Sequence, residues 1–325
     1  MPELPEVETI RRGLERTIVG KKIADVTVRL PKIVSMGPKV VSNIRNNDKA
    51  KAQEFREMLR GCRIISIKRR AKMLIMELVR NLTPSPSPIS ERGVRHAADR
   101  VRSRMLLLVH LKMTGQLVFA KKGEKKNMKI LNLPNARREV LPHKYTHVIF
   151  IFFDGSRLYY NDMRQFGYLR LVQDEDLKNV RELAEYGPEP RELTMEYLGA
   201  KAKRRPKFSI KLFLMDPRVV AGIGNIYSDE ILYWAGVRPA RTLRSLHRPE
   251  FLAIFQAIPK VLNAAVKAQG SSVGDFFKVD GTEGRYGRAH MVYGRYGQRC
   301  KKCGTLIKSV KLGGRTGSFC PKCQQ

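Results

Sequence analysis

The sequence predicts an α+β protein made of three consecutive regions. Short runs rich in β-branched and aromatic residues occupy the chain from about residue 23 to 170, and helical periodicity replaces them after Gln173. Four of the five cysteines lie in the last 26 residues. A chain of 325 residues can bury more than one core. We therefore expect a β-sandwich at 1–173, a helical region at 174–286 and a small cysteine-closed hairpin at 287–325.

The β-rich region begins with a helix. Apolar residues recur at helical spacing up to about Val19, at Val7, Ile10, Leu14 and Ile18. Strands are then expected at 23–30, 63–68, 73–78, 105–111, 116–119, 146–153 and 168–171. Runs this short, separated by polar turns, favour a β-sandwich or a barrel-like domain.

One segment fits neither pattern. Residues 81–104 contain Thr83-Pro84-Ser85-Pro86-Ser87-Pro88 and then a polar, arginine-rich stretch. This low-complexity composition predicts a mobile insertion between two strands. The basic stretch at 121–138 predicts a second solvated loop, and neither segment is expected to carry chemistry.

The second region is predicted to be a series of helices with short breaks. Helical periodicity occurs at 176–186, 193–201, 208–215, 225–235 and about 248–269. The run Gly187-Pro188-Glu189-Pro190 interrupts regular structure. It places the linker between the two regions at about 173–190.

The last four cysteines form two CxxC pairs, Cys300 with Cys303 and Cys320 with Cys323, separated by 16 residues. This spacing is typical of a zinc ribbon, in which four thiolates complete a tetrahedral site and leave no open position for water. We expect one structural zinc ion that closes a β-hairpin. Cys62 stands apart beside an apolar segment and is predicted to be a buried small hydrophobe.

The chain carries 63 Lys and Arg residues against 30 Asp and Glu residues, a formal charge of +33. This excess predicts a polyanionic partner, with nucleic acid as the leading candidate. The longest apolar runs, such as 148–153, are far too short to span a bilayer. The acidic N-terminus lacks the apolar core of a secretory signal. We therefore expect a cytoplasmic protein, and zinc is favoured over disulfides for the four cysteines.

The first residues, Met1-Pro2-Glu3, offer a separate kind of chemistry. Removal of Met1 would expose the secondary amine of Pro2, a nucleophile able to form a cationic imine at an electrophilic carbon. Glu3 and Glu6 can move protons at such a centre. The alternative is structural, because a proline stiffens the start of a helix, and Glu3, Glu6 and Glu8 favour the N-terminal end of the helix dipole.

A series of motifs follows the opening run Met1 to Thr9 in a specific order. They are Arg69-Arg70-Ala71-Lys72, His110-Leu111-Lys112-Met113-Thr114-Gly115, Arg164-Gln165-Phe166-Gly167, Gly222-Ile223-Gly224-Asn225-Ile226-Tyr227, Val292-Tyr293-Gly294-Arg295 and the four cysteines. Each motif is weak alone, but their shared order is specific and spans nearly the whole chain. In this order the chain resembles the formamidopyrimidine-DNA glycosylases, bacterial enzymes that repair oxidised purines.

The resemblance implies a β-sandwich, a helix-two-turn-helix domain and a zinc finger, acting as a monomer on damaged double-stranded DNA bound between the two larger domains. It also implies a bifunctional glycosylase and abasic-site lyase. Such an enzyme excises 8-oxoguanine and formamidopyrimidines and then cleaves the strand by β- and δ-elimination. The damaged base would be everted from the duplex, and a glycine-punctuated loop at 279–286 would cover it.

The resemblance also implies the catalytic residues. The Pro2 amine would attack C1′ of the damaged nucleotide and form a Schiff base. Glu3 would serve as acid and base, and Glu6 would either assist proton movement or hold the site together. Lys72 would be an active-site cation that favours a neutral amine, contacts a phosphate or shares in proton transfer. Its alternative is a solvated basic face.

Five further residues are implied to contact DNA. Met113, Arg164 and Phe166 would fill the gap left by the everted base, with the arginine facing the opposite base. Core packing is the alternative for Met113 and Phe166. Asn225 would bind phosphate, and so would Arg295 from the hairpin that zinc holds rigid. The sequence alone predicts that Asn225 is the N-cap of a helix, a role compatible with phosphate binding, and the alternative for Arg295 is a solvated arginine.

Two departures from the family pattern adjoin this group, Lys112 where glycine is common and Gln165 where a basic residue is common.

Two other functions stay open. An endonuclease VIII-like glycosylase for oxidised pyrimidines would share Pro2, Glu3 and zinc, although Leu4 favours the purine branch. A non-catalytic zinc-ribbon protein that binds nucleic acid would account for the charge and the cysteines alone.

Overall fold

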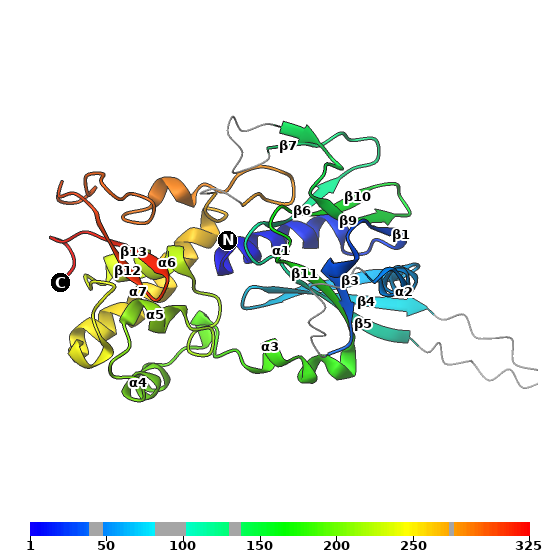
Figure 1. The fold of residues 1–325 in the computed structure, drawn as a ribbon. Coiled ribbons are helices and arrows are strands. Elements are labelled where there is room, and N and C mark those ends of the chain that lie inside the picture. Colours follow the sequence, from blue (N-terminus) through cyan, green and yellow to red (C-terminus); the bar gives the residue numbers. More distant parts are fainter. Residues whose placement is uncertain (39–47, 82–101, 130–137, 273–275) are drawn as a thin grey trace, which may run out of the picture.

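The computed structural model describes residues 1–38, 48–81, 102–129, 138–272 and 276–325. Most of the insertion predicted at 81–104 and part of the basic loop predicted at 121–138 lie outside these residues. Figure 1 shows two bodies side by side, one built mainly from strands and the other mainly from helices, with the N-terminus between them. None of the helices in the described ranges is long and apolar enough to cross a membrane.

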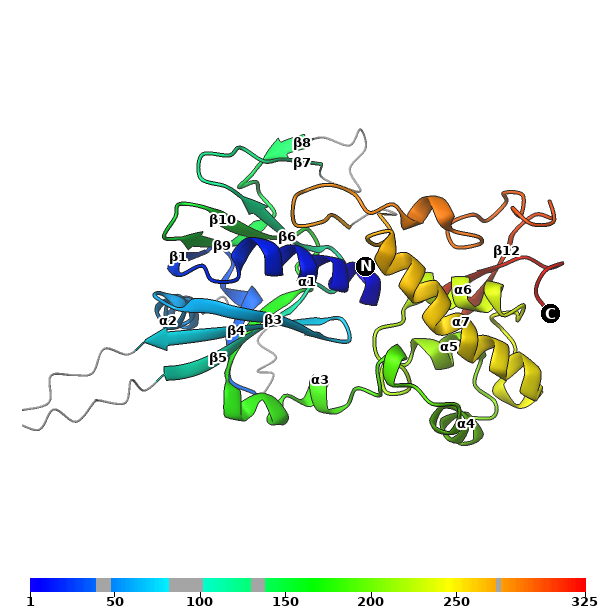
Figure 2. The same cartoon turned by 180° about the vertical axis from the view of Figure 1, so that it is seen from behind.

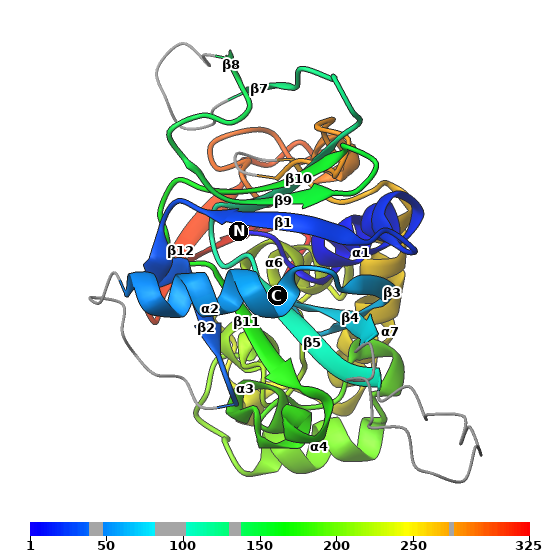
Figure 3. The ribbon, with the colours of Figure 1, turned by 90° about the vertical axis from the view of Figure 1, so that its right-hand side faces the viewer.

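The first body is a sandwich of two sheets, which Figure 3 shows as separate layers. One sheet has the strand order β2-β11-β5-β4-β3 and the other has the order β1-β9-β10-β6. Neighbouring strands are antiparallel except for β2 and β11. The bounds are β1 Ile23–Val28, β2 Val34–Met36, β3 Arg63–Arg70, β4 Met73–Asn81, β5 Arg102–His110, β6 Gly115–Ala120, β9 Thr146–Phe152, β10 Arg157–Asp162 and β11 Tyr168–Gln173.

Side chains from both sheets and from helix α1 (Leu4–Ile18) share one buried core. Leu107 of β5, Phe150 of β9 and Leu14 of α1 belong to it, each with at most 2% of its surface exposed. The apolar spacing read in α1 therefore marks the face that packs between the sheets. The predicted sandwich with an N-terminal helix is confirmed.

The apolar pattern does not predict four strands and a helix of this body. In β10 the buried polar residues Asn161 and Asp162 interrupt the alternation that marks a strand. Helix α2 buries a narrow stripe of Ala52, Phe55 and Leu59 within a lysine-rich sequence. The elements absent from the prediction are β2, β10, α2 (Lys49–Leu59), β7 (Asn127–Lys129) and β8 (Arg138–Val140).

The second body contains the four helices α4 (Met195–Lys203), α5 (Ile210–Met215), α6 (Asn225–Trp234) and α7 (Arg248–Lys267), close to their predicted ranges. The helix predicted at 176–186 is wrong. A 3₁₀ turn at Asp174–Asn179 and the four-residue helix α3 (Arg181–Ala184) take its place. Val180 separates them because its backbone is extended and its side chain is buried against the outer face of the larger sheet.

The C-terminal hairpin pairs β12 (Lys308–Leu312) with β13 (Arg315–Phe319) and packs on α6. Its turn is formed by Gly313 and Gly314, both with positive φ. The predicted hairpin is confirmed.

The chain returns to the first body after α7, as the loop beside β6 in Figure 2 shows. Phe276 and Val279 are buried in the sandwich core, and the N–H of Phe119 in β6 donates to the Val279 carbonyl at 2.8 Å. The domain boundaries after 173 and 286 stay predictions.

Candidate active site and DNA-contacting residues

The N-terminal residues lie where the two bodies meet. Pro2 is buried, and 1% of the Glu3 surface is exposed. One carboxylate oxygen of Glu3 accepts the N–H of Ile226 at 2.8 Å, and the other faces the N–H of Tyr227 at 3.4 Å. Glu3 therefore occupies the N-terminus of α6, where free N–H groups and the helix dipole stabilise a carboxylate.

Two glycines make room for this arrangement. A Cβ at Gly224 would lie 2.5 Å from the carboxyl carbon of Glu3, and a Cβ at Gly222 would lie 2.7 Å from Leu4. Gly222 also has a φ of +105°, which side-chain-bearing residues rarely adopt. The glycine motif thus lets the N-terminal segment reach α6, and the Leu4 N–H donates to the Gly222 carbonyl at 3.0 Å.

Glu6 holds this segment in place. Its Oε2 accepts the N–H of Glu3 at 2.8 Å, and its Oε1 accepts the N–H of Ser271 at 2.8 Å and the Tyr227 hydroxyl at 2.5 Å. Burial, followed by the charge of Glu3, raises the pKa of Glu6. Three donors on one buried carboxyl group favour the second of its two predicted roles, holding the site together.

Lys72 reaches the same place from the turn between β3 and β4. Its Nζ donates to the Ile223 carbonyl at 3.1 Å, between the two glycines that accommodate the N-terminus. Burial lowers the pKa of Lys72, while the charges of Glu3 and Glu6 raise it. The alternative of a solvated basic face is wrong for this side chain.

Glu8 is held by ion pairs in addition to the helix dipole. Arg11, Arg12 and Arg69 bind its carboxylate at 2.8 to 3.1 Å. Burial opposes its ionisation, but the hydrogen bonds from these arginines outweigh burial and lower the pKa of Glu8 to about 2.

We expect Glu8→Gln to reduce the free energy of unfolding by about 2 kcal/mol at pH 7. The depressed pKa gives a stability contribution that is fully present above the ordinary value of 4.5 and is lost as the pH falls through about 2. The difference in the free energy of unfolding between variant and wild type, measured by urea unfolding, should therefore narrow as the pH falls from 4.5 to about 2. Glu15→Gln is the control, because the Glu15 side chain is 52% exposed. A difference that stays constant down to pH 3 would contradict the assignment.

Met113, Arg164 and Phe166 form one cluster at the ends of two sandwich loops. The Arg164 Cζ lies 4.8 Å from the Phe166 ring centroid, and its Nη1 lies 3.3 Å from the Met113 sulfur. Phe166 is 54% exposed, so core packing does not explain it. An apolar side chain, an aromatic ring and a cation are thus presented together to the outside.

A buried carboxylate fixes both loops. Asp162 accepts the backbone N–H of Arg164 at 3.2 Å, the N–H of Gly167 at 2.7 Å and the Thr114 hydroxyl. Sequence reasoning missed Asp162, although an acidic residue two positions before the arginine was a signal for such a loop anchor.

The two departures beside this cluster have a backbone explanation. Lys112 and Gln165 have φ values of +49° and +55°. This left-handed region favours glycine, so a glycine at 112 would be the unstrained choice.

The predicted N-cap role of Asn225 is wrong. Gly224 is the N-cap residue of α6 and Asn225 is the first helical residue, because Glu3 supplies the oxygens that the free N–H groups need. Asn225 Oδ1 is buried and has no hydrogen-bond partner among the described residues.

Arg295 lies before the hairpin, not on it as predicted. Its guanidinium donates to the carbonyls of Met291 at 2.8 Å and Arg299 at 2.7 Å, and to the Gln298 side chain at 3.1 Å. These contacts hold the loop ahead of Cys300.

Arg315 occupies the hairpin position expected for Arg295, and sequence reasoning missed it. It is exposed at the start of β13, and its charge, after burial, lowers the pKa of both Lys72 and Lys211. The hairpin therefore carries an exposed cation. The signal was an arginine in the hairpin turn next to the second cysteine pair.

The four cysteines come together as predicted. Their sulfurs lie within 4.8 Å of one another, with 3.9 Å between Cys300 and Cys323 and 3.5 Å between Cys303 and Cys320. These separations exceed a disulfide bond and suit a tetrahedral zinc ion, whose sulfur ligands stand about 3.8 Å apart for bonds of about 2.3 Å. Four thiolates leave no place for water, so the ion is structural.

Models of three protein domains match the chain in order. They are the formamidopyrimidine-DNA glycosylase N-terminal domain at residues 1–169, the formamidopyrimidine-DNA glycosylase H2TH domain at 186–276 and the zinc finger found in FPG and IleRS at 297–325. The chain belongs to the formamidopyrimidine-DNA glycosylase family. The helix-two-turn-helix domain and the zinc finger with one zinc site are confirmed.

Individual family members are similar over their full length. The formamidopyrimidine-DNA glycosylase of Bacillus anthracis is 34% identical over 326 residues, covering 100% of this chain and 99% of that protein. Lactococcus lactis Fpg, solved in complex with abasic-site DNA, has a TM-score of 0.75 at 28% identity and 99% coverage of each chain. A MutM solved in complex with DNA containing carbocyclic 8-oxo-G has a TM-score of 0.75 at 29% identity and full coverage of both chains.

In this member of the family a buried ion pair joins the zinc finger to the H2TH helices. Lys211 in α5 and Asp229 in α6 are both fully buried, with 2.6 Å between Nζ and Oδ1. The other Asp229 oxygen accepts the N–H of Ser318 in β13 at 2.9 Å. Burial raises the pKa of Asp229 to about 6 against the opposing effect of Lys211. Sequence reasoning missed this pair, because a lysine in an apolar helix has no spacing signal.

Proposed function

We propose that this protein excises oxidised purines, 8-oxoguanine and formamidopyrimidines, from duplex DNA and then cleaves the abasic strand. The observation that supports this most directly is the meeting of the buried Pro2 and Glu3 with the half-buried Lys72 at the N-terminus of α6. A nucleophilic amine, a proton-transfer group and a cation are the parts that covalent chemistry at a sugar carbon needs.

The first step forms a bond between the Pro2 nitrogen and C1′ and breaks the bond between C1′ and the base, which leaves with its electron pair and takes up a proton. Opening of the sugar ring, with proton transfer through Glu3, gives a cationic Schiff base between Pro2 and C1′. Loss of a proton from C2′ then expels the 3′-phosphate, and δ-elimination expels the 5′-phosphate. Met1 must be removed first, because it makes the Pro2 nitrogen an amide.

Protonation of the amine limits this route. An α-amino group titrates near about 8, so roughly a tenth is neutral at pH 7. Glu3 and Glu6 favour the ammonium form, whereas burial and the cations Lys72 and Arg315 favour the neutral amine. We assign Lys72 this electrostatic role, together with contact to a phosphate of the bound strand.

The Met113, Arg164 and Phe166 cluster would replace the stacking and pairing of the everted nucleotide. Asn225, at the first turn of α6, would donate to a backbone phosphate, as helix N-termini commonly do. Arg295 would add phosphate contact through the two of its five N–H donors that its loop leaves free. The protein would act as a monomer in the cytoplasm, on nucleoid DNA.

Borohydride trapping tests the function. Wild-type protein incubated with a duplex that carries one 8-oxoguanine opposite cytosine should give a covalent protein–DNA adduct, and an undamaged duplex should give none. A duplex with an oxidised pyrimidine is the third substrate. Preferential trapping on it would favour the endonuclease VIII-like alternative. If zinc-loaded protein that has lost Met1 forms no adduct with any of the three duplexes, the result would favour the non-catalytic zinc-ribbon alternative.

Salt dependence tests the DNA-binding surface separately. Affinity for an abasic-analogue duplex should fall linearly on a log-log plot as salt rises, with a slope of roughly −0.9 for each phosphate neutralised. Arg295→Gln should reduce the magnitude of the slope by about 1 if Arg295 contacts a phosphate. Fluorescence anisotropy at several salt concentrations measures both slopes, with Arg181→Gln as the control because the Arg181 side chain is 83% exposed and pairs locally with Glu185. Equal slopes for wild type and Arg295→Gln would remove Arg295 from the contact set.

A further inference from the structure

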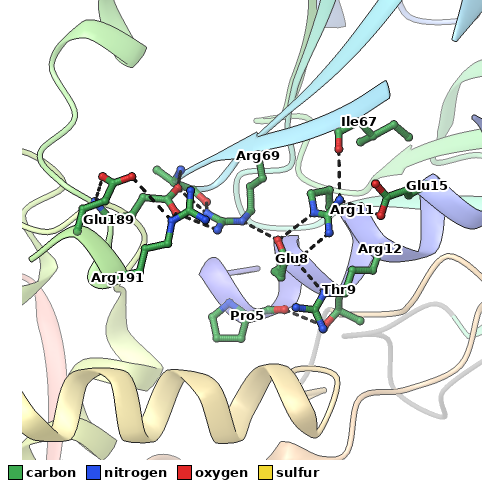
Figure 4. Close-up of polar contacts among 12 residues, drawn as sticks. Pro5, Glu8, Thr9, Arg11, Arg12, Glu15, Ile67, Arg69, Glu189 and Arg191 are labelled. Atoms are coloured by element: carbon green, nitrogen blue, oxygen red, sulfur yellow. Dashed lines mark hydrogen bonds and ion pairs between the residues drawn. The ribbon is translucent and has the colours of Figure 1, made fainter. Parts of the chain in front are cut away.

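A buried ion pair ties the turn that carries Lys72 to the linker between the two bodies (Figure 4). Arg69, at the end of β3, binds Glu189 through two parallel hydrogen bonds of 2.7 and 3.0 Å. The two side chains are 9% and 2% exposed. A bidentate pair with so little water around it fixes both partners in position and orientation.

The same arginine also binds the helix that begins with the catalytic segment. Its Nε donates to Glu8 of α1 at 3.1 Å, as Figure 4 shows. One guanidinium therefore joins α1, the turn between β3 and β4, and the linker of the second body.

Glu189 makes a third contact, to the backbone next to Lys72. Its Oε1 accepts the N–H of Ala71 at 2.7 Å. Ala71 is 1% exposed and has a φ of +55°, a left-handed conformation that alanine rarely adopts. Such a conformation persists where surrounding contacts determine it, and here the contact comes from Glu189.

Neighbouring contacts also attach the turn to the second body and the linker. Arg70 donates to the Gly187 carbonyl in the linker at 2.8 Å and to the Glu192 carboxylate directly after the linker at 2.9 Å. Lys72 itself donates to the Ile223 carbonyl of the second body. The turn belongs to the first body by sequence, but the second body determines its conformation.

We propose that Glu189 is a positioning residue of the active site, which holds the turn at Ala71 so that the Lys72 ammonium faces the N-terminal amine while the two bodies are docked. This rests on the proposed function, in which Lys72 favours the neutral amine. Release of the turn would withdraw that cation, and the amine would become more basic.

Glu189→Gln tests the proposal. The amide has nearly the same volume, but its NH₂ group would face the donors of Arg69 or Ala71. Single-turnover trapping on the 8-oxoguanine duplex should be about tenfold slower at pH 7, and the acid limb of its pH profile should move to higher pH by about one unit. Glu185→Gln makes the same change of charge at a 50% exposed carboxylate that pairs locally with Arg181, and it should behave like wild type.

A double-mutant comparison separates positioning from general damage. In a Lys72→Met background, Glu189→Gln should add little to the slowing and should not move the pH profile, because the cation that it positions is already gone. If Glu189→Gln does not fold, Glu189→Asp keeps the charge but shortens the reach to Ala71, and it should give a smaller shift in the same direction.

An unchanged acid limb in Glu189→Gln, or an equal effect with and without Lys72, would overturn the proposal. Failure of the proposed function looks different, since wild type itself would then trap no DNA.

Discussion

A protein that keeps one extra residue in front of Pro2 should form no borohydride-trapped adduct with 8-oxoguanine DNA. The reason is chemical: the Pro2 nitrogen is then an amide, whose lone pair is delocalised and cannot attack C1′. We expect excision to fall by roughly a thousandfold or more, as removal of a catalytic nucleophile generally gives. Trapping yield and single-turnover excision measure the loss.

The control is the same chain with Met1 removed, verified by intact mass. Affinity of both proteins for an abasic-analogue duplex should agree within a few fold, because the cluster of Met113, Arg164 and Phe166 is distant in sequence and unaltered. Full trapping by the blocked protein would mean that another amine forms the Schiff base, and Lys72 would be the first to test.

Loss of zinc should disable the protein by a different route. Cys303→Ser removes one of four ligands, and a structural zinc site contributes on the order of 10 kcal/mol to the folding of a small module. The hairpin would lose its order and with it the placement of its exposed arginine, Arg315. We expect zinc content well below one per chain and affinity for damaged duplex reduced by about tenfold or more.

Cys62→Ser is the matched control for this variant. Cys62 is fully buried beneath α2 and lies outside the metal cluster, so its replacement should lower stability without releasing zinc. Metal analysis and anisotropy titration distinguish the two variants. Cys303→Ser protein with one zinc per chain and normal affinity would show that the metal does not organise the DNA-contacting surface.

Elements that show an apolar period or a motif spacing in the sequence could be predicted from it. The apolar face of α1, most sandwich strands and the cysteine pairs all have one, and the structure confirms them. The strand β10 and the anchor Asp162 have none, because buried polar groups resemble loop residues until their partners are known.

The candidate site shows the same limit. Glu3 was expected at the reacting centre. Its hydrogen bond to the first N–H groups of α6, however, joins residues 3 and 226, which are far apart in the sequence. That contact also displaced Asn225 from the N-cap. Arg295 and Arg315 both precede a cysteine pair. Only the path of the chain shows that Arg295 supports a loop, whereas Arg315 is exposed at the start of β13.

The return of Phe276 and Val279 to the sandwich core has a consequence for biosynthesis. These residues are made more than a hundred positions after the last strand of the sandwich, β11, which ends at Gln173. A nascent chain that has emerged only that far lacks two apolar side chains of its own core, and Gly13 of α1 faces an empty space where Val279 will sit. The first body therefore cannot reach its final packing on the ribosome until the helices are complete, which makes the active site one of the last parts of the molecule to mature.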